Sequence, residues 1–353
     1  MTSLADQRIA LVGGGGFIGH HLALRLKAEG AQVHIVDDFA HNNLEVRLAS
    51  GTSDPMDEIH KSILQERLEL LQGASIPLHK VDASRVQALS EVLGEIQPTV
   101  LAHLAAISSA ELTELDPRSA FECGLKSLVN SLELGNHRLE RFVYFSSSMV
   151  YGNFLSAEAD EGHPASPVNL YGAIKLLGER LVMAYGRKSD LPYVIVRPSA
   201  LYGPRCVSGR IVERLLNQAR HNMPLTIAGD GTGRLDFTFV DDLVNGICLA
   251  IKRPQAIRQV FNMTFGKART FLELVEIIRI QFPNSTVEYC RDQDTRPQRG
   301  TLCIRKAADL LGYSPEFNLE RGVPAYLKWM GSRPVRQPVS ATQSSAQMHR
   351  ANA

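Results

Sequence analysis

The sequence predicts an α/β protein: a doubly wound parallel sheet covered by helices on both faces, followed by a smaller C-terminal α/β lobe. Short apolar runs alternate along the first part of the chain with segments that have the apolar spacing of helices. A parallel sheet with helices on both faces requires this alternation, and its buried strands appear as continuous apolar runs. With 353 residues, of which 44% are hydrophobic, the chain can bury a large core and form more than one domain.

The first elements form a strand–helix–strand unit. A strand is predicted over Arg8–Val12 and ends in glycines, and a helix follows over Phe17–Glu29 until Gly30 stops it. The next strand, Gln32–Val36, ends at Asp37. A glycine-rich turn between strand and helix, with an acid after the second strand, is the order of a Rossmann-type βαβ unit.

The later apolar runs continue the sheet and divide the chain. Further strands are predicted over 76–81, 100–104, 142–145 and 194–197, and a helix over 56–71 in the long segment 39–77, to which we assign no function. Loops rich in glycine and proline follow residue 197, which indicates a separate lobe from which the sheet can still recruit a strand. We predict a Rossmann domain over 1–197, a substrate-binding lobe over 198–330 and a disordered tail over 331–353, which lacks apolar periodicity.

Composition excludes several classes of function. The net charge of +1 gives no reason to expect nucleic acid or an anionic membrane surface as a partner. No apolar run approaches the length of a membrane span, and the N-terminus leaves no room for a signal peptide. The five cysteines are scattered and form no cluster with histidine, so neither a metal site nor a disulfide framework is predicted. A cytoplasmic protein with reduced thiols is expected.

The glycine-rich turn predicts a dinucleotide site. Gly13, Gly16 and Gly19 allow a sharp turn, a close approach of the backbone to a pyrophosphate and tight packing of the helix on the strand. The amides near Phe17 and Ile18, at the helix N-terminus, would face the anion. A tight turn without a ligand is the alternative, but the strand before it and the helix after it favour the functional interpretation.

Acidic residues after the second and third strands refine this prediction. Asp37 is placed to bind the adenosine ribose, and Asp38 with no Arg or Lys before Arg47 disfavours a 2′-phosphate, so the predicted cofactor is NAD. Asp82, after the third strand, is a candidate contact for adenine together with Ala83. A helix N-cap is the equally weighted alternative for Asp82.

A Tyr–Lys pair predicts proton transfer. Tyr171 and Lys175 lie four residues apart, so on a helix both side chains project from one face. An ammonium beside a phenol is expected to lower the pKa of the phenol toward working pH. The Ser147 hydroxyl can share the same substrate oxygen, which gives a site suited to hydride transfer at a carbinol carbon. The alternative is that Tyr171 and Lys175 are an exposed surface pair without function; the presence of Ser147 and of the glycine-rich turn disfavours it.

Taken together, these motifs resemble the extended short-chain dehydrogenase/reductase family, particularly the nucleotide-sugar epimerases and dehydratases such as UDP-glucose 4-epimerase. The similarity extends from about residue 8 to about residue 326. The matching segments are 13–19, 36–38, 103–106, 145–152, 169–175, 197–204 and 229–242. The order and spacing of these segments make the resemblance highly specific.

The resemblance implies roles for individual residues. Tyr171 would be the general acid/base, Lys175 would hold the ribose hydroxyls and tune Tyr171, and Ser147 would contact the substrate hydroxyl. The cofactor would also be lined by Leu104, Ala105, Ala106 and Pro198. A nucleotide sugar as substrate, and a homodimer formed through the helices around Tyr171 and Phe121, are implied as well.

Two residues discriminate among the reactions of the family. Sugar dehydratases and decarboxylases of this family carry an acid where this chain has Ser148 and Met149. A thioether cannot carry a proton, so elimination and decarboxylation are disfavoured, and the pattern resembles the 4-epimerases. A net oxidoreductase acting on a keto-sugar or another alcohol is the alternative, and a non-catalytic NAD-binding regulator a third.

The substrate half departs from the family pattern. The departures are Gly124, Ala200, Leu235 and Arg299. The family expects an arginine at Leu235 to hold the diphosphate, but Arg234 lies one residue earlier, and in a strand this shift turns the side chain to the other face. Arg234 and Arg296 remain candidate substrate contacts. Cys303 falls where related epimerases set the size of the sugar pocket. The alternative is that Cys303 is an ordinary buried cysteine of the core.

Overall fold

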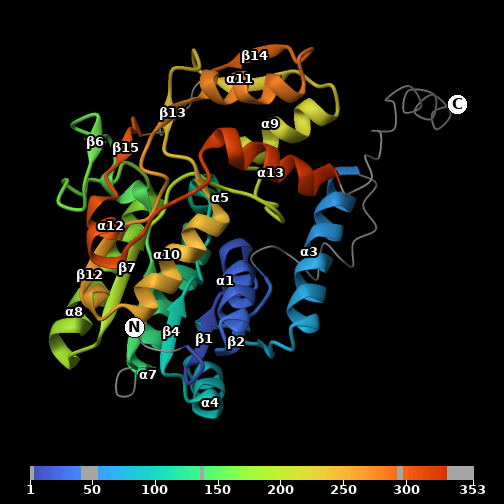
Figure 1. Cartoon of the computed structure of the whole chain (residues 1–353). Coiled ribbons are helices and arrows are strands. Elements are labelled where there is room, and N and C mark those ends of the chain that lie inside the picture. The colour runs from blue at the N-terminus through green and yellow to red at the C-terminus, as the bar shows by residue number, and fades with distance from the viewer. Residues whose placement is uncertain (1–3, 41–54, 136–138, 292–296, 332–353) are drawn as a thin grey trace, which may run out of the picture.

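A seven-stranded parallel sheet forms the centre of the protein, seen in the computed structural model, which describes residues 4–40, 55–135, 139–291 and 297–331 (Figure 1). Its strand order is β12-β7-β5-β4-β1-β2-β3, and every neighbouring pair is parallel. The strands are β1 Arg8–Val12, β2 Gln32–Asp37, β3 Leu78–Lys80, β4 Val100–His103, β5 Arg141–Phe145, β7 Tyr193–Arg197 and β12 Gln259–Asn262. The predicted doubly wound fold is therefore confirmed.

Helices cover both faces of this sheet. The α-helices of the described residues, in the lobe as well as on the sheet, are α1 Phe17–Ala28, α3 Pro55–Gly73, α4 Val86–Ile96, α5 Ala110–Leu115, α6 Pro117–Phe121, α7 Ser127–Leu134, α8 Leu170–Ser189, α9 Ile211–Arg220, α10 Val240–Lys252, α11 Phe271–Gln281, α12 Arg305–Leu311 and α13 Leu319–Gly331. Within β1, Ile9 and Leu11 pack on the face that carries α1 and α10, while Ala10 and Val12 pack on the face that carries α4, α7 and α8. An apolar residue at every position of β1 after Arg8 is what burial on both faces requires.

The C-terminal half contributes both to the sheet and to a lobe of its own. β12 pairs with β7 from Gln259↔Val194 to Asn262↔Arg197, which confirms that the sheet recruits a strand from beyond residue 197. The lobe contains α9, α11, α13 and the parallel pair β9 Leu225–Ala228 with β14 Val287–Cys290, around a second apolar core (Figure 1). The division of the chain at residue 197 stays a prediction.

Three further two-stranded pairs connect the lobe to the C-terminal ends of the central strands. They are β6 Glu158–Ala159 with β15 Thr301–Leu302, β8 Leu201–Tyr202 with β11 Thr238–Phe239, and β10 Arg234–Leu235 with β13 Arg269–Thr270. The carboxyl ends of parallel strands are where ligands bind in open α/β sheets. The lobe therefore lies over the edge of the sheet that carries the candidate site.

The helix in the segment 39–77 joins the cofactor side of the sheet to the lobe. α3 lies beside α1, and one of its ends approaches α13 (Figure 1). Arg67 of α3 is 2% exposed and donates from Nε to the carbonyl oxygen of Arg205 at 3.1 Å. Glu66 accepts from Arg205 at 3.3 Å and from Trp329 of α13 at 3.2 Å. A structural function thus emerges for a segment whose sequence suggested none.

Two histidines of α1 complete this connection. The guanidinium of Arg205 donates from Nε to His20 Nε2 at 3.0 Å, and its Nη2 lies 3.4 Å from His21 Nδ1. The other ring nitrogens contact the carbonyl oxygens of Gly16 and Pro204, each at 2.9 Å. Burial lowers the pKa of His20 and lowers that of His21 to about 3, so both rings are neutral and can accept from Arg205.

Candidate active site

The glycine-rich turn is packed too tightly for side chains, except at the helix N-terminus. Gly13 has φ +80°, and a Cβ there would meet the Ala105 nitrogen at 2.4 Å, so the turn lies directly against the predicted cofactor-lining residues that follow β4. A Cβ on Gly16 would meet only the Gly13 oxygen, at 3.5 Å. Gly16 caps α1 without a side-chain bond, and the first turn of α1 carries no acid. The amides of Phe17 and Ile18 therefore remain available to an anion, as a pyrophosphate requires.

Replacing Gly19 with alanine is expected to weaken NAD binding and lower the free energy of unfolding by about 1–3 kcal/mol. A Cβ there would lie 2.4 Å from the Gly14 oxygen, so helix and turn would have to separate. Gly94→Ala in α4 is the matched control, because a Cβ at Gly94 meets nothing within 4 Å. That control should be neutral or stabilising by up to about 1 kcal/mol, and equal effects in chemical denaturation would contradict the packing argument.

Asp37 stands at the end of β2 and holds the glycine-rich turn. Its Oδ2 accepts the Gly15 amide and its Oδ1 accepts the Phe39 amide, each at 2.8 Å. Burial raises the pKa of Asp37 to about 6, although both amide bonds oppose this shift. Asp38 accepts the Ala40 amide at 3.0 Å. Asp37 thus lies where a ribose bound beside the turn would meet it, with lone pairs left for the hydroxyls.

NAD affinity is expected to fall as the pH is lowered through about 6, because protonation of Asp37 would remove the charge that we predict to accept the ribose hydroxyls. The contribution of Asp37 to folding runs in the opposite direction. Its pKa is raised on folding, so the stability that it contributes is present below its unfolded pKa and lost as the pH rises through about 6. Calorimetric titration of NAD into protein stripped of its cofactor, between pH 5 and 8, measures the first effect. Asp37→Asn should bind more weakly with a flat pH profile, and a flat profile in the unmodified protein would exclude Asp37 as the ribose ligand.

Asp82 shapes the turn that follows β3. Its Oδ1 accepts the Ser84 amide at 2.9 Å, and Arg85 caps α4. The alternative that Asp82 is the N-cap of the helix is therefore wrong. Ala83 is buried, and its carbonyl accepts Asn130 Nδ2 at 2.9 Å. A cofactor contact for Asp82 and Ala83 stays a prediction.

The structure brings the predicted catalytic residues together at the start of α8. Asn169 caps this helix by accepting the Gly172 amide at 2.9 Å, so Tyr171 and Lys175 lie in its first two turns. A Cβ on Gly172 would meet the Met149 carbonyl oxygen at 2.6 Å, so the helix lies directly on the turn that carries Ser147. The Ser147 hydroxyl accepts the Met149 amide at 3.2 Å, and it lies close enough to the Tyr171 phenol to lower the pKa of that phenol.

The electrostatics of the pair differ from the prediction. Lys175 is 5% exposed, its Nζ donates to the Phe145 carbonyl at 2.7 Å, and it lies 6.0 Å from the centre of the Tyr171 ring. Burial lowers the pKa of Lys175 to about 8. Burial also raises the pKa of Tyr171, against the lowering effects of the Arg210 charge and the Ser147 hydrogen bond. The predicted net depression of the Tyr171 pKa by Lys175 is therefore wrong, because desolvation of the phenol outweighs nearby charge.

The predicted substrate contacts are only partly assembled. Leu235 is buried in the core of the lobe, whereas Arg234 is exposed and donates to the Ala268 carbonyl at 3.2 Å. Their regular pairing with β13 keeps the two side chains on opposite faces. Cys303 is 6% exposed, and its sulfur accepts from Arg305 at 3.0 Å. Arg296 lies outside the described residues.

The backbone of Ala200 has an unusual conformation for alanine. It has φ 38°, a left-handed conformation that asparagine tolerates and alanine adopts at a cost of about 1–2 kcal/mol. The asparagine that the family carries there suits this conformation.

Sequence reasoning missed three charged residues near the site. Glu179 lies two helical turns after Tyr171 on the same face of α8 and is 1% exposed, and Arg197 at the end of β7 is 5% exposed. The spacing of Tyr171, Lys175 and Glu179 could have revealed the first. Arg210 caps α9 and is the group whose charge most favours the Tyr171 phenolate. No sequence motif marked Arg210.

Two negative findings apply to the described part of the chain. It contains no group of three or more histidine, cysteine or acidic residues arranged to hold a metal ion. None of its helices combines the length and the apolar character needed to cross a membrane.

A family model for the NAD dependent epimerase/dehydratase family matches residues 9–264, which is most of the region described above. The chain belongs to this family. Its cofactor is NAD, and the open helix N-terminus at Gly16 together with the acid at Asp37 fits that cofactor.

Relatives of this family member span more than one reaction. The uncharacterized UDP-glucose epimerase YtcB of Bacillus subtilis (strain 168) is 29% identical over 92% of this chain and 98% of its own length. UDP-glucuronic acid decarboxylase 4 of Arabidopsis thaliana is 27% identical over 96% of this chain and 73% of its own length. The crystal structure of UDP-glucuronic acid 4-epimerase from Bacillus cereus, in complex with UDP-glucuronic acid and NAD, superposes with a TM-score of 0.79 at 29% identity, covering 92% and 99% of the two chains. These relatives support an enzyme acting on nucleotide sugars with NAD.

Proposed function

We propose that the protein is an isomerase that catalyses the C4 epimerisation of a UDP-sugar. The observation that carries this proposal is Met149, which stands in the turn after Ser147 and against α8, where elimination or decarboxylation would need a carboxyl group. A thioether neither donates nor accepts a proton at useful rates. Ser147, Tyr171 and Lys175 are the groups that an alcohol–ketone interconversion needs.

In the proposed reaction Tyr171 removes the proton of the C4 hydroxyl, and Ser147 holds the oxygen by a hydrogen bond. NAD, when bound, accepts the C4 hydride and later returns it. The 4-keto sugar rotates between the two hydride transfers, so that the other face of C4 receives the hydride, and Tyr171 then returns the proton to the C4 oxygen. Lys175 holds the ribose hydroxyls and adds positive charge beside the phenol when it leaves the Phe145 carbonyl. No external oxidant is consumed, so the cofactor remains bound.

The substrate is proposed to be a UDP-hexose, UDP-hexosamine or UDP-uronic acid. Cys303 falls where related epimerases set the size of the sugar pocket, and a small residue there supports a substituted sugar as substrate. The diphosphate is proposed to be held by nearby cations, for which Arg210, Arg234, Arg296 and Arg299 are the candidates.

A cytoplasmic homodimer is proposed as the working form. Large apolar side chains stand exposed on α5, α6 and α8, the helices around Tyr171 and Phe121; they are Leu112, Leu115, Phe121, Leu170 and Leu177. Exposed apolar groups gathered on neighbouring helices support association through this face.

The test is to incubate the purified protein with UDP-glucose, UDP-glucuronate and UDP-N-acetylglucosamine, without added cofactor, and to follow the products by NMR. Formation of a C4 epimer supports the proposal. A pentose product, a 4-keto-6-deoxy product, or a failure to convert any of the three UDP-sugars would overturn the proposal.

A net oxidoreductase is the second candidate, and the changed diphosphate clamp favours it. A buried Leu235 stands where the family pattern expects an arginine for the diphosphate, which favours a substrate without a diphosphate. Cofactor retention separates the two proposals. An epimerase keeps NAD through gel filtration and stays redox-neutral, whereas an oxidoreductase exchanges it and converts added NAD or NADH in proportion to product.

A further inference from the structure

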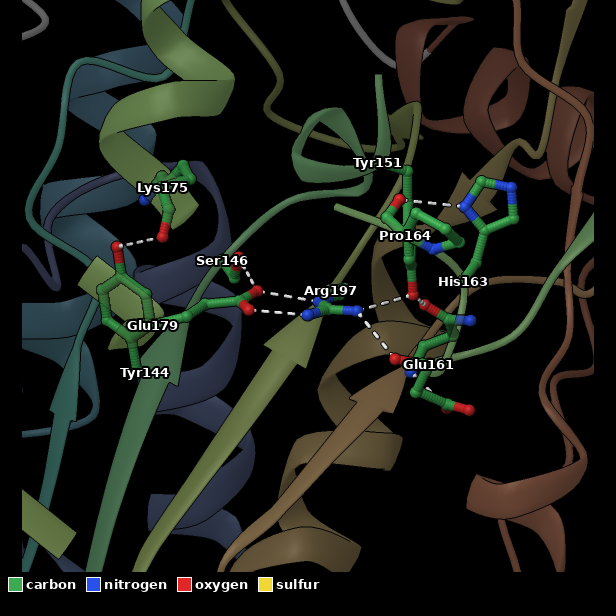
Figure 2. Close-up of polar contacts among 10 residues, drawn as sticks. Tyr144, Ser146, Tyr151, Glu161, His163, Pro164, Lys175, Glu179 and Arg197 are labelled. Carbon is green, nitrogen blue, oxygen red and sulfur yellow. Dashed lines mark hydrogen bonds and ion pairs between the residues drawn. The ribbon is translucent and has the colours of Figure 1, made fainter. Parts of the chain in front are cut away.

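A buried glutamate, Glu179, lies on α8, the helix that carries Tyr171 and Lys175. Glu179 is in α8, two turns after Tyr171, and forms a bidentate pair with Arg197 at the end of β7 (Figure 2). Arg197 Nε donates to Glu179 Oε1 at 2.7 Å and Nη2 donates to Oε2 at 2.6 Å. The two side chains are 1% and 6% exposed.

The pair is extended on both sides by hydrogen bonds. Ser146 donates its hydroxyl proton to Glu179 Oε1 at 2.5 Å, and Arg197 Nη1 donates to the Tyr151 hydroxyl at 2.9 Å (Figure 2). Tyr151 in turn donates to Asn262 Oδ1 at 2.7 Å. The network thus connects α8 with the ends of β5, β7 and β12, which surround the site.

The bond from Ser146 has a geometric consequence for the next residue. Ser147 has φ −161° and ψ 153°, an extended backbone in which successive side chains point to opposite sides. The Ser146 amide is held by the Val196 carbonyl at 2.8 Å and the Ser148 amide by the Pro198 carbonyl at 2.9 Å. With Ser146 held toward Glu179, the Ser147 hydroxyl is directed to the other side, where Tyr171 lies.

We propose that Glu179 and Ser146 are positioning residues that hold the Ser147 hydroxyl in place for Tyr171. Neither is placed to touch substrate or cofactor, and both act through the orientation of Ser147. A buried network in which each member is satisfied fixes one arrangement of its surroundings, which suits this role. The kinetic part of the test rests on the proposed epimerase function, whereas a second measurement does not.

The kinetic test compares Ser146→Ala, Ser146→Thr and Ser131→Ala. Ser146→Ala should lower kcat about tenfold or more with KM changed little, because a small misplacement of a reacting group slows the chemical step. Ser146→Thr keeps a hydroxyl and should restore most of kcat. Ser131 is a buried hydroxyl in α7 that donates to the Ser127 carbonyl at 2.9 Å, outside the network, so Ser131→Ala controls for losing a buried hydroxyl. A kcat in Ser146→Ala no lower than in Ser131→Ala would overturn the proposal.

The second measurement is the ionisation of Tyr171, followed by ultraviolet difference titration against the same variant carrying Tyr171→Phe. The hydrogen bond from Ser147 lowers the pKa of Tyr171, so its loss in Ser146→Ala should raise that pKa, and Ser131→Ala should not. A raised pKa in a protein that turns over no UDP-sugar would support the positioning proposal and overturn the proposed function. An unchanged pKa would overturn the positioning proposal whatever the substrate.

Discussion

Replacing Tyr171 with phenylalanine is expected to lower kcat by about 10²–10⁴-fold while NAD remains bound. The substitution removes only the hydroxyl that exchanges the proton, and the ring keeps its place in the first turn of α8. The effect should fall on kcat, because the hydroxyl acts in the transition state rather than in substrate binding. Single-turnover assays with the active UDP-sugar, together with calorimetric titration of NAD, measure both quantities.

Tyr185→Phe provides the matched control on the same helix. Its hydroxyl donates to Glu133 at 3.2 Å on the surface, far along α8 from the site, so its removal should leave kcat within about twofold. If Tyr171→Phe retained a third or more of the activity, Tyr171 could not be the general acid/base, and Ser147 would become the leading candidate.

Replacing Glu179 with alanine is expected to lower the free energy of unfolding by about 3–5 kcal/mol, because Arg197 would be left buried without its counter-ion. Arg197 donates two of its hydrogen bonds to this carboxylate, and the pair is almost fully shielded from solvent. Chemical denaturation with an unchanged m-value would measure the loss.

Two comparisons sharpen this prediction. Glu179→Leu combined with Arg197→Met removes both charges and should recover most of the stability, because a buried ion pair and an apolar pair of similar volume are close in free energy. Glu276→Ala, which removes an exposed pair with Arg279, should change the stability by less than about 0.5 kcal/mol. A small effect of Glu179→Ala would mean that water reaches Arg197.

The sequence allowed the sheet to be predicted because its strands have a simple physical signature. Runs such as Ile9–Val12 are apolar at every position, since both faces of the sheet are covered, and parallel strands are joined by helices of recognisable spacing. The convergence of Ser147, Tyr171 and Lys175 could also be predicted, because the motif spacing specifies one helix face against one turn.

What could not be predicted depends on burial and on contacts between distant residues. The direction of the Tyr171 pKa shift is set by desolvation, which no spacing of charges reveals. Arg205 meets His20, His21 and Glu66 only after α3 has packed beside α1, and nothing in the segment 39–77 indicates that contact. Arg234 and Leu235 are an intermediate case: the one-residue shift was visible, and the strand pairing decided its consequence.

The position of β12 makes the assembly of this protein depend on the order of its synthesis. β7 is complete at Arg197, but its outer neighbour ends at Asn262, about 65 residues later, which corresponds to roughly 3–13 s of translation. During that interval β7 is a bare, apolar sheet edge, the kind of surface on which nascent chains pair wrongly with one another. A fragment that stops at residue 197 should therefore aggregate rather than fold.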